Sequence, residues 1–284
     1  MTKTVVITGA SSGIGAEAAV MLAAKGYNVV PIGRSEQKLE AVAARMKAAG
    51  QDTVTPLQAD LATLSEVRRV TSEILEQCPR IDVLINNAGV LEPSVTQTSE
   101  GFERTWAINH LAPFLMTVLL KERLEASHPV RVVTTSSTAA NQGVIKLADI
   151  DGQMHGKDKP RPMQAYCATK LANALFSIEL ARRWEGTGNT SNHVHPGAVD
   201  TNWGTDTWWL RWGKAVSRPL VFITPQQGAR ALVHCASDPE GATASGKFFS
   251  PKAGTFKARP RARDMEVAAA LWAASEKAVG ETWA

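Results

Sequence analysis

Tyrosine is scarce in this chain, since only two of its 284 residues, Tyr27 and Tyr166, are tyrosines, against eight tryptophans. Cysteine is also scarce. Cys78, Cys167 and Cys235 are widely spaced and form no CxxC pair, which excludes a disulfide framework and argues against a CxxC metal or redox motif. We interpret the three as reduced, mostly buried thiols of a cytoplasmic protein.

Long apolar runs and a large excess of one charge are missing as well. The longest near-continuous apolar run, residues 111–120, is far too short to span a membrane. The 31 Lys and Arg residues against 27 Asp and Glu give a net charge of only +4, so we predict no nucleic-acid partner. With 44% hydrophobic and 20% charged residues, the chain can bury a core, which excludes a disordered or fibrous protein.

Short apolar runs alternate with helical patterns along the whole chain. Such alternation predicts an α/β fold, a single doubly wound Rossmann domain over residues 1–284, with a parallel sheet of about seven strands and helices on both faces. Capping boxes at residues 63–66 and 224–227 predict two helix starts. The predicted strands are residues 5–8, 28–32, 53–58, 82–85, 131–135, 191–195 and 247–249, and the predicted helices include residues 13–25, 35–49, 99–125, 164–184 and a C-terminal helix at 264–279.

A glycine-rich loop joins the first strand to the first helix. Glycines there let the backbone approach a pyrophosphate, and the helix N-terminus presents free N–H groups to the anion. A tight turn is the alternative, but the position between strand and helix favours a nucleotide. The candidate phosphate-binding residues are Gly9, Ser11, Ser12, Gly13, Ile14 and Gly15.

The end of the second strand, Ile32-Gly33-Arg34, carries no acid that could take a ribose 2′-hydroxyl. A guanidinium there could bind a 2′-phosphate, although an ordinary surface arginine is the alternative. We expect NADP(H) to be favoured over NAD(H).

Tyr166 and Lys170 stand four residues apart and therefore on one face of a helix. A neighbouring cation lowers a phenol's pKa, which would let Tyr166 act as general acid or base toward a carbonyl/alcohol pair. Ser136 or Ser137, at the end of the fifth strand, could donate to the substrate oxygen. Pro113 lacks the N–H that would bind the carbonyl of Asn109, so we expect a kinked helix whose free carbonyl holds a water against Lys170.

These motifs resemble those of the short-chain dehydrogenase/reductase family, and within it the retinol-dehydrogenase-like branch. The likeness covers nearly the whole chain and includes the TGxxxGxG loop, Asn109, the Ser-Tyr-xxx-Lys set and Pro196-Gly197 with Thr201. It implies that Tyr166 exchanges the proton, Lys170 holds the nicotinamide ribose, Ser137 orients the substrate and Asn109 completes a proton relay. It also implies cofactor contacts for Asp60, Leu61, Asn87, Ala88, Gly89, Pro196, Gly197, Val199 and Thr201. Gly33 departs from the pattern, and we expect it to leave the 2′-phosphate pocket more open.

Two segments are expected to set substrate choice. One is the polar stretch between Ser137 and Tyr166. The other, residues 201–223, resembles a substrate lid and contains Trp203, Trp208, Trp209 and Trp212, which suggests a lipophilic or aromatic substrate. Packing onto the domain, a subunit contact in a homodimer or homotetramer, and contact with a membrane surface are alternative uses of these indoles, the last not favoured.

The sequence thus favours an NADP-dependent oxidoreductase that interconverts a carbonyl and an alcohol on a lipophilic small molecule by hydride transfer. A non-catalytic NADP-binding sensor or interaction protein on the same fold is the alternative, which has little need of the Tyr-Lys pair. The histidines show no metal-ligand spacing, so we predict no metal. We interpret His110 and His195 as structural residues.

Overall fold

The computed structural model describes residues 2–197, 223–250, 255–256 and 260–283. Its strands form one sheet in the order β3-β2-β1-β4-β5-β6-β7-β8. The strands are β1 (Thr4–Thr8), β2 (Asn28–Gly33), β3 (Leu57–Gln58), β4 (Val83–Asn86), β5 (Arg131–Thr135), β6 (Thr190–Val194), β7 (Phe248–Phe249) and β8 (Thr255–Phe256). The first seven pair in parallel, as predicted, and β8 adds a short antiparallel edge that the sequence pattern does not indicate.

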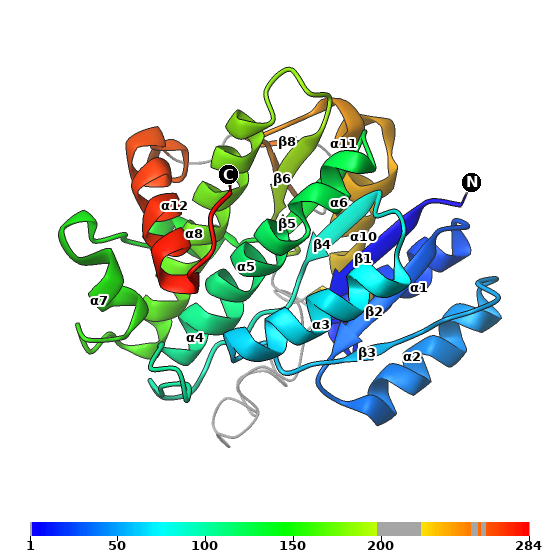
Figure 1. Cartoon of the computed structure of the whole chain (residues 1–284), viewed down its shortest axis with the longest axis horizontal. Coiled ribbons are helices and arrows are strands. Elements are labelled where there is room, and N and C mark those ends of the chain that lie inside the picture. Colours follow the sequence, from blue (N-terminus) through cyan, green and yellow to red (C-terminus); the bar gives the residue numbers. More distant parts are fainter. Residues whose placement is uncertain (1, 198–222, 251–254, 257–259, 284) are drawn as a thin grey trace.

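Helices cover both faces of the sheet (Figure 1). The helices are α1 (Gly13–Ala24), α2 (Glu36–Ala48), α3 (Leu64–Gln77), α4 (Arg104–Trp106), α5 (Ala112–Leu119), α6 (Lys121–Ala126), α7 (Ile150–Met154), α8 (Pro162–Arg183), α10 (Pro225–Ser237), α11 (Pro239–Thr243) and α12 (Met265–Val279), together with a π-helical turn, η1 (Ala107–Leu111), and the 3₁₀ turns η2 (Thr138–Gln142), η3 (Leu147–Asp149) and η4 (Pro260–Arg263). On one face α1 packs against α2 and α10, and on the other α3 packs against α5.

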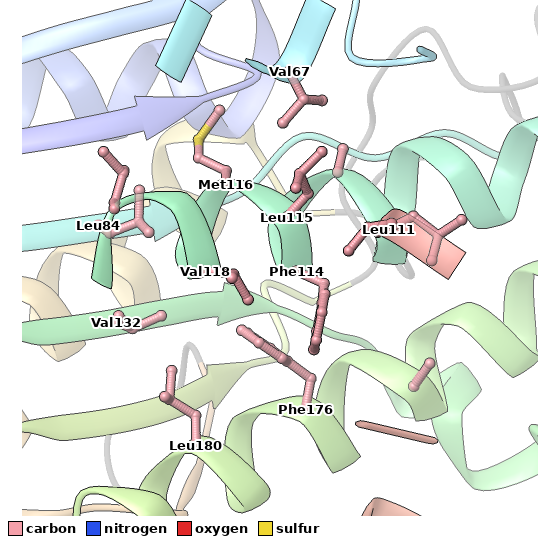
Figure 2. Close-up of a cluster of buried hydrophobic side chains, with 14 of the residues drawn as sticks. Val67, Leu84, Leu111, Phe114, Leu115, Met116, Val118, Val132, Phe176 and Leu180 are labelled. Carbon is pink, nitrogen blue, oxygen red and sulfur yellow. The ribbon is translucent and has the colours of Figure 1, made fainter. Parts of the chain in front are cut away.

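The larger core lies between the sheet and the α3–α5–α8 layer. Figure 2 shows α5 at its centre, with Phe114 facing Phe176 of α8, and Leu84 and Val132 presented by the sheet. The rings of Phe114 and Phe176 lie edge to face with centroids 6.0 Å apart. Apolar side chains thus pack α5 and α8 against β4 and β5, and the candidate site lies at the ends of these two strands.

Two predicted elements differ most from the structure. The third strand is confined to two residues because the side chain of Gln51 binds the backbone of Val29 and Thr53, which takes the place of a strand ladder there. The predicted helix 99–125 begins only at Arg104, because Glu103 caps it through the N–H of Trp106. It is then broken into α4, η1, α5 and α6.

The two predicted capping boxes have different outcomes. At Thr224 the box is complete, with both reciprocal bonds to Gln227. At Thr63 only half forms, since the hydroxyl accepts from the N–H of Glu66 at 3.4 Å while the Glu66 carboxylate binds Arg69. Glu100 instead accepts from the free N–H groups of the first turn of α3.

The strand order reverses between β1 and β4, so their carboxyl ends diverge into a crevice. The stretch between Ser137 and Tyr166, expected to be polar, contains η2, η3 and α7. The three cysteines are buried and free, as predicted.

Candidate active site

The glycine loop after β1 is packed so tightly that side chains would not fit. A Cβ on Gly15 would lie 2.3 Å from the carbonyl oxygen of Gly9, and a Cβ on Gly9 would lie 2.8 Å from the Cα of Ala88. Gly9 and Gly13 have positive φ angles of 68° and 58°, which favour glycine. At the start of α1, Ser12 makes no side-chain capping bond, so its hydroxyl leaves the first-turn N–H groups available to an anion. The cradle fits a dinucleotide pyrophosphate.

Asn87 holds the loop in place. Its Nδ2 donates to the carbonyl oxygens of Thr8 at 3.0 Å and Gly9 at 3.4 Å, and its Oδ1 accepts from Thr135 Oγ1 at 3.3 Å. The amide therefore joins the ends of β1, β4 and β5. The family likeness implies that Asn87 contacts the cofactor, whereas in this structure its side chain binds protein groups.

The pocket beside β2 is not more open at Gly33, contrary to our expectation. A Cβ at this position would lie 2.7 Å from the Cβ of Ser11 and 2.8 Å from its Oγ. Ser11 therefore fills the space that the missing side chain leaves. Arg34, the next residue, is exposed, and its guanidinium pairs with no carboxylate among the described residues. It is available to a ligand phosphate.

Asp60 and Leu61 follow β3 at the same edge. Half of the Asp60 side chain, 49%, is exposed, and its Oδ1 accepts from the N–H of Ala62. Leu61 is buried in the core. Of this pair, only the Asp60 carboxylate is exposed enough to meet a ligand.

Tyr166 and Lys170 lie on the buried face of α8, as their spacing predicts. Lys170 Nζ is 5.5 Å from the centroid of the Tyr166 ring and donates to the carbonyl oxygen of Thr135 at 3.1 Å. The Ser137 hydroxyl hydrogen-bonds the Tyr166 phenol. Ser136 instead donates to the carbonyl oxygen of Lys170 at 2.7 Å and is buried. Ser137 is thus the serine that the structure brings to the tyrosine.

Burial controls the charge of this pair. It raises the pKa of Tyr166, against the opposing effect of the Ser137 hydrogen bond, and it lowers the pKa of Lys170 to about 8. The expectation of a lowered phenol pKa is therefore wrong for this structure, because burial raises the pKa of Tyr166 and outweighs the effects that lower it. Near pH 7 the phenol keeps its proton, and the Lys170 side chain is charged in most molecules.

Asn109 sits in the π-helical turn that Pro113 accompanies, so the predicted irregularity of this helix is confirmed. The N–H of Ala112 reaches back five residues to the carbonyl oxygen of Ala107. The Asn109 side chain is occupied on both sides, by the backbone of Val90 and by Thr169 Oγ1. Only its backbone carbonyl, which Pro113 cannot bind, is left as the candidate for a relay.

Gly89 completes the contact between Asn109 and Lys170. A Cβ there would lie 3.2 Å from Lys170 Nζ and 3.3 Å from Asn109 Oδ1. A side chain at this position would require both polar groups to move by a few tenths of an ångström, so the glycine allows their close approach to the backbone.

Several predicted residues lie beyond the described part of the chain. Pro196 is buried just after β6, and Gly197 has a φ of 92°. Val199, Thr201, Trp203, Trp208, Trp209 and Trp212, and with them most of the predicted lid, lie outside the described residues. Among the described residues, no cluster of His, Cys, Asp or Glu is arranged to hold a metal ion, and none of the described helices is long and apolar enough to cross a bilayer.

One residue beside the site was not assigned a role by sequence reasoning. Asn173, one turn after Lys170, donates to the same Thr135 carbonyl oxygen at 3.1 Å. Asn173 stands three residues after Lys170 and therefore on the same helix face, and this spacing could have indicated that it lies beside the site.

A buried tyrosine and lysine with a half-buried serine, beside a nucleotide cradle at the switch point, define a nucleotide-dependent dehydrogenase. The sequence pattern of the short chain dehydrogenases matches residues 3–149. Human retinol dehydrogenase 13 is 37% identical over 98% of this chain and 85% of its own length, and human retinol dehydrogenase 12 is 38% identical over 99% and 87%. The chain belongs to the short chain dehydrogenase family and is an oxidoreductase of that family.

Solved structures agree with this assignment. An uncharacterised protein from Mycobacterium paratuberculosis superimposes with a TM-score of 0.79 at 36% identity, covering 99% of this chain and 95% of that one. A blue fluorescent protein from a metagenomic library, in complex with NADPH, has a TM-score of 0.68 at 27% identity and covers 87% of this chain and 95% of its own.

Proposed function

We propose that this protein is an NADP(H)-dependent oxidoreductase that interconverts a carbonyl and an alcohol on a lipophilic small molecule, with Tyr166 as general acid and base. The observation that carries the proposal is the set of buried Tyr166 and Lys170 with half-buried Ser137 at the carboxyl edge of the sheet. Relatives named retinol dehydrogenases support alcohol and carbonyl as the reacting groups.

Tyr166, Ser137 and Lys170 have different roles in the proton transfer. In the reducing direction, the protonated Tyr166 gives its proton to the substrate oxygen, toward which Ser137 donates a second hydrogen bond. The Lys170 cation lies 5.5 Å from the ring centroid and stabilises the phenolate left behind. In the oxidising direction the same phenolate takes the alcohol proton. A bound nicotinamide would supply or accept the hydride.

Two features support NADP(H) as the preferred cofactor. The end of β2 carries no acid, and Arg34 is exposed beside it; a guanidinium suits a 2′-phosphate. The NADPH complex of a structural relative is consistent with this choice.

The lipophilic substrate class rests on apolar residues in the two segments that are expected to set substrate choice. Val144 and Leu147 are 51% and 48% exposed in the segment between Ser137 and Tyr166. The predicted lid, residues 201–223, contains four tryptophans. Sites for largely apolar ligands are lined mainly by hydrophobic and aromatic side chains.

The test is to titrate the protein with NADPH and NADH in thermal-shift measurements, and then to follow NADPH oxidation with a panel of lipophilic aldehydes and ketones. NADPH at 100 times its Kd is expected to add about 2.7 kcal/mol of stability. Tyr166→Phe should lose about 10²–10⁴-fold in turnover while binding NADPH normally.

Tyr27→Phe is the matched control, because the only other tyrosine precedes β2 and packs against the core formed with α1 and α2. It should turn over substrate as the wild type does. Equal activity of Tyr166→Phe and wild type would refute the assigned role. Stabilisation by NADPH with no turnover on any carbonyl would favour the sensor alternative.

A further inference from the structure

Gly143 lies in close contact with α8, directly beside the candidate site. A Cβ at this position would lie 2.4 Å from the carbonyl oxygen of Cys167 and 2.7 Å from the Cβ of Leu171. Cys167 is the residue that follows Tyr166. The φ of Gly143 is −64°, a value that other residues also adopt. Glycine is therefore needed here for the close approach to α8, and not for the backbone conformation.

The turn η2 connects this contact to the Ser137 hydroxyl. The N–H of Gly143 donates to the carbonyl oxygen of Ala140 at 3.1 Å, and the N–H of Ala140 donates to that of Ser137 at 3.1 Å. Ser137 Oγ accepts from the N–H of Ala139 at 3.2 Å, so η2 also holds the hydroxyl oxygen and leaves its proton to be donated. Because the segment is short and hydrogen-bonded at both ends, a displacement at Gly143 is passed on to Ser137.

Ser136 fastens the start of the same segment to the same helix. Its buried hydroxyl donates to the carbonyl oxygen of Lys170 at 2.7 Å. Cys167 and Lys170 stand three residues apart on α8, so the two contacts lie on adjacent positions of one helical turn. The segment that holds Ser137 therefore meets α8 along the turn that runs from Tyr166 to Lys170.

We propose that Gly143 is a positioning residue, whose contact with the Cys167 carbonyl sets where η2 holds the Ser137 hydroxyl relative to Tyr166. The inference deepens the proposed function and rests on it for its catalytic consequence. A methyl group at Gly143 must move η2 and α8 apart by about 1 Å, the difference between 2.4 Å and ordinary contact near 3.4 Å. A misplacement of about 1 Å can lower a rate by about 10²-fold.

The main test is a double-mutant cycle in the full chain, with kcat measured for wild type, Gly143→Ala, Ser137→Ala and the double variant. Gly143→Ala should lower kcat by about 10- to 100-fold. The Kd for NADPH should stay within about twofold of wild type, because the three atoms nearest to the new Cβ all belong to α8. When Ser137 is already alanine, the same change at Gly143 should lower kcat by less than about twofold, since the hydroxyl that it displaces is gone.

Gly241→Ala is the matched control for a clash with a helix carbonyl. A Cβ at Gly241 would lie 1.9 Å from the carbonyl oxygen of Cys235. The carbonyl oxygen of Gly241 accepts from Thr190, the first residue of β6, so the control lies at the amino edge of the sheet, opposite the candidate site. Both substitutions overpack a backbone contact and should lower the melting temperature. Gly241→Ala should nevertheless leave kcat unchanged.

NMR of labelled tyrosine rings reports on the site without turnover. The chain contains only Tyr27 and Tyr166, so Tyr27→Phe assigns both sets of signals. Gly143→Ala should shift the Tyr166 signals and leave those of Tyr27 in place. Gly241→Ala should leave the Tyr166 signals in place, which separates a local effect on the site from a general loss of stability.

Ser136→Ala replaces Gly143→Ala in the cycle if the glycine variant does not fold. It removes the other contact between the segment and α8 without adding an atom, and it should shift the Tyr166 signals and lower kcat only while Ser137 is present. For whichever variant is used, a wild-type kcat, equal losses of kcat with and without Ser137, or unchanged Tyr166 signals would overturn the inference.

Failure of the proposed function gives a different pattern. The wild type would then turn over no carbonyl, while Gly143→Ala would still shift the Tyr166 signals and Gly241→Ala would not. In that case the role of Gly143 in placing η2 against α8 would stand without its catalytic consequence.

Discussion

Gly33→Ala is a small change that should weaken cofactor binding. Gly33 ends β2 with an ordinary strand backbone, so alanine brings no strain of its own there. The effect comes only from contact, because the new Cβ would lie 2.7 Å from the Cβ of Ser11 and 2.8 Å from its Oγ. Ser11 belongs to the loop that cradles the phosphates, so the clash pushes directly on that loop.

The size of the effect follows from the distances. Ordinary van der Waals contact begins near 3.4 Å, so Ser11 must move by about 0.7 Å from its 2.7 Å contact. Overpacking of this kind costs about 1–3 kcal/mol of folding stability. A shift of that size also misaligns one charge-assisted hydrogen bond between the loop and the cofactor phosphates. Such a bond contributes about 1.5–3 kcal/mol to binding. Its loss corresponds to a roughly 10- to 150-fold rise in the Kd for NADPH.

The assay is fluorescence titration of NADPH into wild type, Gly33→Ala, and Gly33→Ala combined with Ser11→Gly. Without the Ser11 side chain, the nearest remaining atom to the new Cβ is the Ser11 nitrogen at 3.2 Å, so the double variant should recover most of the affinity. Wild-type affinity in Gly33→Ala, or equal loss in the single and double variants, would show that this contact does not control the loop.

Three further changes test other parts of the structure. Arg34→Ala should raise the Kd for NADPH at least about tenfold and leave that for NADH unchanged; equal losses for both cofactors in the same titrations would contradict a 2′-phosphate contact. Trp272→Ala should cost about 3–5 kcal/mol and about 5–8 °C in melting temperature, because the ring is 2% exposed and stacks on Phe176; a calorimetric shift below about 2 °C would argue against a packed C-terminal helix. Burial lowers the pKa of His234, but hydrogen bonds to Glu240 and Asp238 outweigh it and leave the pKa raised. The stability that wild type has over His234→Gln should therefore be complete below pH 6.5 and fade as the pH rises through the raised pKa; a difference in melting temperature that is constant from pH 6 to 9 would refute this.

The parallel core of the fold was predictable because its strands are buried on both faces and appear as short apolar runs. The predicted strand 131–135 has the same first and last residues as β5, since both of its ends coincide with changes in composition. The short edge strand β8 was not predictable, because two residues carry no periodicity. The start of α4 depends on the Glu103 cap and on the Glu100 carboxylate, which is drawn to α3 by a tertiary contact.

The residues of the site were easier to find than their interactions. The spacing of Tyr166 and Lys170 places them on one helix face, which the structure reproduces. The prediction that the pKa of Tyr166 is lowered is wrong, because the spacing of two residues does not show how deeply they are buried. Burial raises the pKa of this phenol and is the larger effect. Gly33 was misjudged for a related reason: the occupant of its space, Ser11, comes from another turn of the chain.

Hydrogen bonds between strand ends connect the proposed cofactor loop to the proposed catalytic lysine. Thr8 Oγ1 accepts from the N–H groups of Asn87 and Ala88, and Asn87 holds the carbonyl oxygens of Thr8 and Gly9. Thr135 donates to Asn87 through its hydroxyl and binds Lys170 through its carbonyl oxygen. The proposed phosphate loop and Lys170 are therefore two ends of one polar network across β1, β4 and β5. Because a partly broken buried network leaves polar groups unpaired, damage at Asn87 should disturb the lysine as well as the loop, and the two functions should fail together rather than one at a time.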